Sequence, residues 1–226
     1  KRGGKPVLEW VVRRATDCQL LDGVIVVTSN AADNQFVSEL VPLDVPVFTA
    51  SKADALGCLA AALEGYPAEA AVRICARSPF IDPTLIDRLI STAEAHDDCD
   101  YVGYQSRDGR PAILSPVGMY AEWFRSSALR RAAQKAKSRV DRQQATRYLY
   151  HHPHKFNVFS IPAPEQIDRD DVRLTVDIEE DWEHTLVIFE ALGPDDLDWQ
   201  RIADLLVHQP HLRKRMAALN RVHARG

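Results

Sequence analysis

The chain has 226 residues, of which 46% are hydrophobic and 27% charged, and its formal net charge at pH 7 is −4. A chain of this size can bury a core, so we expect one α/β domain or a domain with a sizeable insertion. The acidic balance argues against broad nucleic-acid binding, and no apolar run approaches the roughly 18 residues that a membrane span needs. We therefore expect a cytoplasmic globular protein whose partners include neither nucleic acid nor a membrane.

The cysteine and histidine patterns give little support for a metal or redox centre. The four cysteines lie far apart without Cys-x-x-Cys spacing, and we expect them to be reduced thiols in the core. The one local cluster is His151-His152-Pro153-His154, in which the proline breaks helical register and no cysteine or carboxylate lies nearby in the sequence. We expect these histidines to be structural.

The first residues, Lys1-Arg2-Gly3-Gly4-Lys5-Pro6, form a glycine loop directly before a helical pattern. The two glycines permit positive φ and leave amide N–H groups uncovered, and Lys5 adds a cation at the positive end of the next helix dipole. Such a loop can bind phosphate, although this composition more often forms a plain turn, and it matches neither the P-loop nor the dinucleotide-binding motif. Phosphate loops of this kind normally follow a strand, so we expect a strand and part of the loop before Lys1.

Helices and strands alternate from the loop to residue 98. We expect helices over 7–18, around 36–40, from Ser51 or Asp54 to residue 63, and from Pro83 to residue 90, with strands over 23–29, 45–48 and 71–75. This alternation predicts a three-layer, doubly wound and mainly parallel sheet of the Rossmann-like kind. Ligands are then expected beyond the C-terminal ends of the strands.

The pattern changes over about 103–155, where we expect an inserted α+β lobe. Turn formers at 106–111 precede short strands expected over 112–114 and 119–124 and polar helices expected over 126–137 and 141–150. Further strands are expected over 156–161 and 173–176, and C-terminal helices over about 179–222.

Taken in order, these stretches resemble the cytidylyltransferase family of the spore-coat polysaccharide biosynthesis protein F type, which is related to the CMP-Kdo and CMP-sialic acid synthetases. The most specific match is Arg-Leu-Thr-Val-Asp-x-x-Glu-Asp at 173–181, and the loop 1–5 and the segments 45–56 and 72–83 are similar to family segments in the same order. The resemblance covers nearly the whole chain. It implies a single domain over 1–226 with a nucleotide-diphospho-sugar transferase-like fold, and a homodimer.

The resemblance also implies CTP and a sugar, possibly an acidic one, as substrates. A sugar oxygen would attack the α-phosphate and pyrophosphate would leave. On the matching positions, Arg2 and Lys5 are catalytic groups that hold the phosphates together with Gly3 and Gly4. Asp177 is then a Mg²⁺ ligand, although taken alone it suits equally well the cap of the helix that follows it.

Four further positions match the nucleotide and sugar sides of the site. Arg73 is structural or close to the nucleotide, and Ser78, at the same strand end, is expected to bind the nucleotide. Glu122 and Arg142 resemble sugar-side positions, although either side chain also suits a solvated surface.

Three positions depart from the family pattern. Arg77 stands where the family has an aspartate that ligates the metal, Cys58 stands where an arginine usually faces the phosphates, and Lys1 replaces an arginine. As a catalytic group Arg77 would supply the charge that a metal would have given, or it pairs with Asp82 or another carboxylate on the surface. The alternatives to a cytidylyltransferase are a lapsed nucleotide- or sugar-binding protein on the same fold and a glycosyltransferase.

Overall fold

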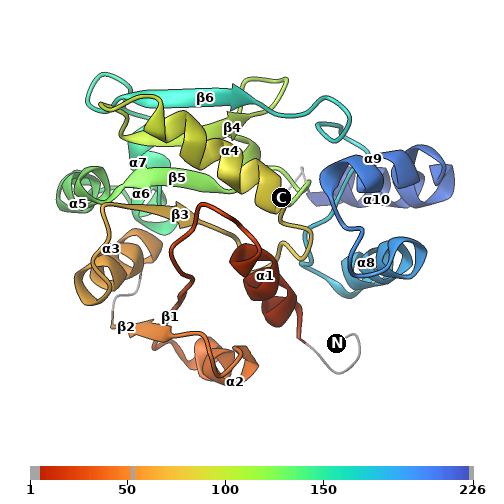
Figure 1. Ribbon diagram of the computed structural model, residues 1–226, viewed down its shortest axis with the longest axis horizontal. Helices are drawn as coiled ribbons and strands as arrows, with labels where there is room; N and C mark the ends of the chain where they lie inside the picture. The colour runs from red at the N-terminus through yellow and green to blue at the C-terminus, as the bar shows by residue number, and fades with distance from the viewer. Residues whose placement is uncertain (1–5, 52–53, 224–226) are drawn as a thin grey trace.

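Strands form two sheets in the computed structural model, which describes residues 6–51 and 54–223 (Figure 1). β1 (Val26–Ser29) and β2 (Val47–Ala50) pair in parallel. The second sheet has the order β3-β5-β4-β6 and consists of β3 (Ala70–Arg73), β5 (Glu122–Arg125), β4 (Tyr101–Gln105) and β6 (Val158–Pro162). β5 runs antiparallel to both of its neighbours, and β4 is parallel to β6. The predicted mainly parallel α/β fold is confirmed.

Helices cover both faces of the larger sheet. Neighbouring side chains along its strands point to opposite sides, so that Val102 and Trp123 join one buried cluster while Tyr101 and Phe124 join another. Figure 1 shows α4 (Pro83–Glu94) over one face, and the second cluster places α5 (Ser126–Lys135) and α7 (Arg147–Tyr150) on the other. The sheet is the middle of three layers, as predicted.

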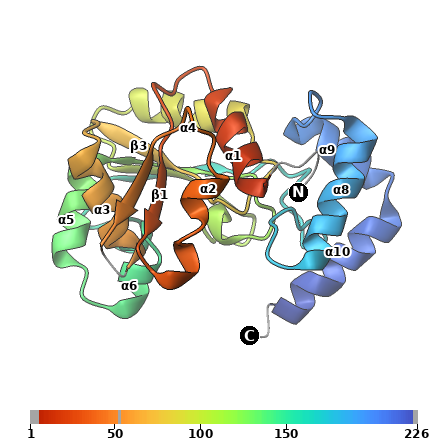
Figure 2. The ribbon, with the colours of Figure 1, turned by 90° about the horizontal axis from the view of Figure 1, so that it is seen from below.

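Six further helices form two groups (Figures 1 and 2). Those that flank the smaller sheet are α1 (Val7–Thr16), α2 (Val37–Leu40) and α3 (Ala55–Gly65). The second group consists of α8 (Glu179–Leu192), α9 (Trp199–Val207) and α10 (Pro210–His223), with α8 next to α1. None of the helices in the described ranges combines the length and apolarity of a membrane span.

Aspartate side chains fix the starts of α3 and α4, and Asp54 is one of the two caps that the sequence predicts for α3. Asp54 accepts from the backbone N of Gly57 at 2.8 Å, and Asp82 accepts from the backbone N of Thr84 at 2.8 Å. Asp82 is fully buried, and its second oxygen accepts from the backbone N of Trp199 at 2.9 Å. It therefore joins the start of α9 to the start of α4 and is not the partner of Arg77.

The strand predicted over 173–176 is wrong. The segment carries the β-branched residues of a strand, but it lies beside loops rather than beside a strand edge. Its backbone is held by three hydrogen bonds, from Leu174 N and Thr175 N to Pro116 O (2.8 and 3.2 Å) and from Val176 N to Arg77 O (2.8 Å). These contacts fix the segment next to the loop that follows β3.

The segment expected as an inserted lobe, 103–155, is partly built into the larger sheet, because β5 pairs with both β3 and β4. The strand expected over 112–114 is a short 3-10 helix, η2 (Ala112–Leu114), and the helix expected over 141–150 is split into α6 (Arg139–Gln143) and α7. Ala145, with φ of +21°, turns the chain between these two helices. The turn brings Thr146 within 2.7 Å of Glu122 on β5.

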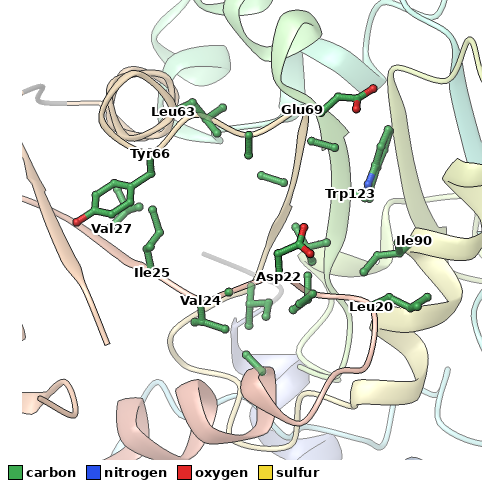
Figure 3. Close-up of a pocket in the computed structure, with 18 of the residues that line it drawn as sticks. Leu20, Asp22, Val24, Ile25, Val27, Leu63, Tyr66, Glu69, Ile90 and Trp123 are labelled. Carbon is green, nitrogen blue, oxygen red and sulfur yellow. The ribbon is translucent and has the colours of Figure 1, made fainter. Parts of the chain in front are cut away.

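A mainly apolar cavity of about 970 Å³ lies between the two sheets, bordered by β1, β3 and the ends of α1, α3 and α4 (Figure 3). Trp123, Ile90 and Leu63 contribute to its wall, and the few charged side chains there include Asp22 and Glu69. None of the predicted site residues that the structure describes lines this cavity. The chemistry predicted from the sequence lies elsewhere, at the strand ends.

Candidate nucleotide site

Arg77 and Asp177, which are 100 residues apart in the sequence, form an ion pair between Arg77 Nη1 and Asp177 Oδ1. Arg77 lies beyond the C-terminal end of β3, and Asp177 directly follows the extended segment 173–176 that hydrogen-bonds to the backbone of Arg77. This is the edge at which α/β sheets bind their ligands. The Arg77 side chain is 59% exposed and that of Asp177 is 25% exposed, so solvent reaches the pair.

Both carboxylate oxygens of Asp177 accept hydrogen bonds from side chains. Oδ1 accepts from Arg77, and Oδ2 accepts from the Thr175 hydroxyl at 3.1 Å and from Arg173 Nη2 at 3.3 Å. Asp177 thus lies between two guanidinium groups. The carboxylate is neutralised by the protein itself.

Behind this pair, Arg173 and Asp181 form a buried two-pronged ion pair. The Arg173 side chain is 4% exposed and that of Asp181 is fully buried, with Nε to Oδ1 at 2.6 Å and Nη2 to Oδ2 at 2.8 Å. Asp181 also accepts from the backbone N of Asp177 at 3.0 Å and so fixes the turn into α8. Burial favours a higher pKa for Asp181, but the hydrogen bonds from Arg173 and from the backbone outweigh burial and lower the pKa.

These residues do not fit a resident Mg²⁺ ion. Mg²⁺ prefers oxygen ligands, and here each oxygen of Asp177 already accepts a hydrogen bond from a guanidinium, whose positive charge repels a divalent cation. The formal charges of Arg77 and Arg173 cancel those of Asp177 and Asp181. Within the described ranges, no group of three or more His, Cys, Asp or Glu side chains could hold a metal ion.

Arg73 and Glu122 form a second ion pair inside the larger sheet. The two residues are partners in the β3–β5 register, and Arg73 Nε lies 2.7 Å from Glu122 Oε2. Glu122 is fully buried and also accepts from the hydroxyls of Thr146 and Tyr101, each at 2.7 Å. Burial, together with the neighbouring Glu122 carboxylate, raises the pKa of Tyr101, so its phenol stays protonated and donates. Glu122 itself is shielded from solvent, whereas 25% of the side chain of its partner Arg73 is exposed.

Arg142 links α6 to α3 and α5. Its Nη2 donates to Asp54 Oδ2 at 3.0 Å, and its Nη1 donates to the carbonyl oxygens of Ala133 and Ala136 at 3.1 and 3.3 Å. Its side chain is 30% exposed. The same Asp54 caps α3, the helix on which Cys58 lies. Burial, and to a smaller extent the negative charge of Asp54, raises the pKa of the Cys58 thiol.

The other predicted positions are a turn residue and the glycine loop. Ser78 is 2% exposed and lies in the turn after Arg77, with its backbone N donating to Cys75 O at 3.1 Å. Arg2, Gly3, Gly4 and Lys5 lie outside the described residues. The helix that follows them is described, and the Trp10 ring of α1 packs on the Phe189 ring of α8 with centroids 4.9 Å apart. α1 therefore packs against the helix that begins just after Asp177.

A family model described as cytidylyltransferase matches residues 2–205. The chain belongs to the cytidylyltransferase family. The resemblance inferred from the glycine loop and from the motif at 173–181 is therefore confirmed.

Two relatives of this cytidylyltransferase-family chain cover most of its length. It is 30% identical over 214 residues to the uncharacterized protein MJ1063 of Methanocaldococcus jannaschii, and the match covers 94% of this chain and 84% of the relative. It is 24% identical over 192 residues to the spore coat polysaccharide biosynthesis protein SpsF of Bacillus subtilis, with 84% of this chain and 76% of the relative covered.

Solved structures show the same fold in two further proteins. A cytidylyltransferase from Leptospira borgpetersenii serovar Hardjo-bovis superposes with a TM-score of 0.78 at 19% identity, over 93% of this chain and 86% of that one. A CMP:2-keto-3-deoxy-manno-octonic acid synthetase complexed with CTP superposes with a TM-score of 0.59 at 14% identity, over 83% of this chain and 89% of that one.

Sequence reasoning missed the side chains that hold the two ion pairs in place. Arg173 and Asp181 lie in the quoted family motif, at positions i−4 and i+4 from Asp177, but only the middle residue was predicted to act. That spacing was the available signal for Arg173 and Asp181. Tyr101 and Thr146, which hold Glu122, left no signal because they reach it only through the sheet and the turn at Ala145.

Proposed function

We propose that this protein is a nucleotidyltransferase that uses CTP to activate a sugar, giving a CMP-sugar and pyrophosphate for surface polysaccharide or glycan biosynthesis. Membership of the cytidylyltransferase family supports nucleotidyl transfer. The relative named for spore coat polysaccharide biosynthesis and the neighbour named as a CMP-sugar-acid synthetase support the choice of acceptor. The single observation that carries the site is the meeting of Arg77 and Asp177 beyond the end of β3.

In the proposed reaction, a sugar hydroxyl oxygen attacks the α-phosphorus of CTP. A bond forms between that oxygen and phosphorus, the bond from the α-phosphorus to the bridging oxygen of the β-phosphate breaks, and the hydroxyl proton passes to water. The broken bond leaves its electron pair on pyrophosphate, so fixed cations near the triphosphate favour the transition state. Arg77 suits this task because its charge is permanent and its side chain is exposed. The loop residues Arg2 and Lys5 would contact the phosphates from the start of α1.

The sugar side of the proposal is centred on Arg73. Its Nε is held by the buried Glu122, so the guanidinium is fixed while a quarter of its side chain faces solvent. An acidic sugar offers a carboxylate, which a guanidinium binds well. Glu122 then acts through Arg73, and Arg142 acts by holding α6 against the start of α3.

The experiment is to incubate the protein with each of the four ribonucleoside triphosphates and a panel of neutral and acidic sugars, and to measure pyrophosphate. We expect release that requires both CTP and an acidic sugar. CTP binding without pyrophosphate release would support a lapsed binding protein instead, an outcome that Arg77 favours because it replaces a metal-ligating carboxylate of the family. Sugar transfer from a supplied nucleotide-sugar would support a glycosyltransferase.

A further inference from the structure

We propose that this chain binds the triphosphate through the guanidinium of Arg77 and without a protein-bound divalent cation, and that Asp177 is the anchor of Arg77 rather than a metal ligand. The inference rests on the proposed function and deepens it. It assigns a positioning role to Asp177 and makes nucleotide binding independent of magnesium ligation by the protein.

Both oxygens of Asp177 already accept hydrogen bonds from cationic side chains, Oδ1 from Arg77 and Oδ2 from Arg173. A metal ion on Asp177 would have to share Oδ1 with the Arg77 guanidinium, or displace the Thr175 and Arg173 donors from Oδ2. Arg173 cannot follow such a displacement, because both of its prongs are held by the fully buried Asp181. A divalent cation would then lie beside a fixed guanidinium, and like charges at short distance repel.

The Arg77 guanidinium is held along one edge by protein groups and is open to solvent along the other. Its Nη1 contacts Asp177 and its Nε lies 3.4 Å from the Cys75 sulfur, whereas Nη2 has no hydrogen-bond partner among the described residues. More than half of the side chain is exposed. A guanidinium presents five donors in one plane, and fixing one edge leaves the others available for phosphate oxygens.

A backbone hydrogen bond also fixes the position of residue 77 relative to the segment before Asp177. Val176 N donates to Arg77 O at 2.8 Å, so the backbone of Arg77 is joined to the residue that precedes Asp177, independently of the two side chains. The Arg77 guanidinium can therefore receive a triphosphate on its open edge while Asp177 holds the other edge and the segment 173–177 stays in place. A carboxylate at position 77 in this geometry would face Asp177 and create a pair of oxygen ligands.

The metal half of the proposal is tested without nucleotide, by titrating Mn²⁺ into the protein and following the free ion by electron paramagnetic resonance. We expect the wild-type protein to bind no Mn²⁺ at millimolar concentration and Arg77→Asp to gain one site. Arg13→Asp is the matched control, because it makes the same charge change and leaves a carboxylate beside the exposed Asp44, to which Arg13 is paired. We expect no site in that variant. A wild-type Mn²⁺ site that Asp177→Asn abolishes would overturn the proposal.

The nucleotide half is tested by calorimetric titration of CTP, once with Mg²⁺ and once with EDTA. We expect wild-type affinities within about threefold of each other, and an affinity for Arg77→Ala that is lower by about tenfold or more in both buffers, as loss of a charge-assisted contact implies. Arg77→Lys keeps the charge and should retain part of the affinity, and Arg13→Ala should match the wild type. Wild-type binding that requires Mg²⁺, or an Arg77→Ala variant that binds normally, would overturn the inference.

Failure of the inference and failure of the proposed function give different results. CTP binding that needs Arg77 but yields no pyrophosphate with any sugar removes the transferase proposal and leaves the Arg77 assignment standing. Pyrophosphate release that needs both Mg²⁺ and the Asp177 carboxylate, with Arg77→Ala fully active, removes the inference and leaves the transferase.

Discussion

The two ion pairs at the end of β3 differ in what surrounds them. Glu122 is fully buried and takes three hydrogen bonds, one from Arg73 and two from hydroxyls, whereas Arg77 and Asp177 meet in solvent with the arginine 59% exposed. A buried charge is tolerated only when it is fully hydrogen-bonded, and removing its partners is costly. An exposed pair contributes little to stability, because water and salt compete for both charges.

The comparison distinguishes Arg73, which is held by a buried partner inside the sheet, from Arg77, which is held by an exposed partner on a loop. Arg73 is positioned by the fold, since its partner lies across the strand pair, so removing that partner should lower the stability of the protein as well as weaken the proposed sugar contact. Arg77 is positioned by a loop contact and should act on ligand binding with little effect on the fold. The substitutions below test that division, beginning with the largest expected effect on stability.

Glu122→Ala should be the most destabilising single change. It leaves the Arg73 guanidinium and the hydroxyls of Tyr101 and Thr146 without their acceptor inside the sheet. We expect the free energy of unfolding to fall by about 3–5 kcal/mol, measured by urea denaturation. Glu69→Ala, which removes the 87% exposed partner of Arg125, is the control and should cost about 0.5 kcal/mol or less. Equal losses in the two variants would contradict the division.

Asp181→Asn should cost about 3 kcal/mol at neutral pH, because Arg173 loses its charged partner in a buried site. It should also change the dependence on acid. The folded-state pKa of Asp181 is lowered, so its contribution to stability is present above the unfolded value of about 3.9 and is lost as pH falls through the lower folded value. The free energy of unfolding, measured by urea denaturation at a series of pH values from about 6 downward, should therefore fall less steeply for the variant than for the wild type. The same pH dependence in both proteins would show that Asp181 does not contribute this acid-sensitive part of the stability.

Gly118→Ala should cost about 3 kcal/mol and loosen the segment before Asp177. Gly118 has φ of +67°, and a Cβ there would lie 2.9 Å from the backbone N of Thr175. Gly109→Ala is a matched control, since Gly109 has φ of +82° with nothing within 4 Å of the added atom, and should cost about 1 kcal/mol. CTP titration of both variants should show weakened binding only for Gly118→Ala. A similar stability loss in both would mean that backbone strain, and not contact with Thr175, decides the effect.

The elements that sequence predicts well are those whose signals are local. The Asp54 cap of α3 and the start of α4 at Pro83 with its apolar face each depend on a few neighbouring residues, and the structure has them. The residues of the extended segment 173–176 have strand propensity and so predict a strand, but propensity says nothing about whether a partner strand lies alongside. The placement of β5 between β3 and β4 likewise depends on pairing between residues that are 49 positions apart, such as Arg73 and Glu122.

The candidate site divides in the same way. The family motif identified Asp177 and the aligned position identified Arg77, but their contact joins residues 100 positions apart and follows from the fold alone. A charge exchange at one position read in isolation leaves two meanings open, a shifted site or a lapsed one. Only the geometry shows that the exchanged arginine is bound to the remaining aspartate, which turns the question into a measurable one about metal and nucleotide.

Arg77→Ala should change stability least and binding most. Its ion pair is open to solvent, so we expect the free energy of unfolding to stay within about 0.5 kcal/mol of the wild type. Asp177 keeps Arg173 and Thr175 as donors in this variant, and the backbone bond from Val176 to residue 77 is unchanged, so the segment 173–177 stays in place. A loss of CTP affinity measured alongside unchanged urea denaturation then belongs to the removed guanidinium. A variant that unfolds as readily as Glu122→Ala would show that the two ion pairs form one structural unit and that the division between them is false.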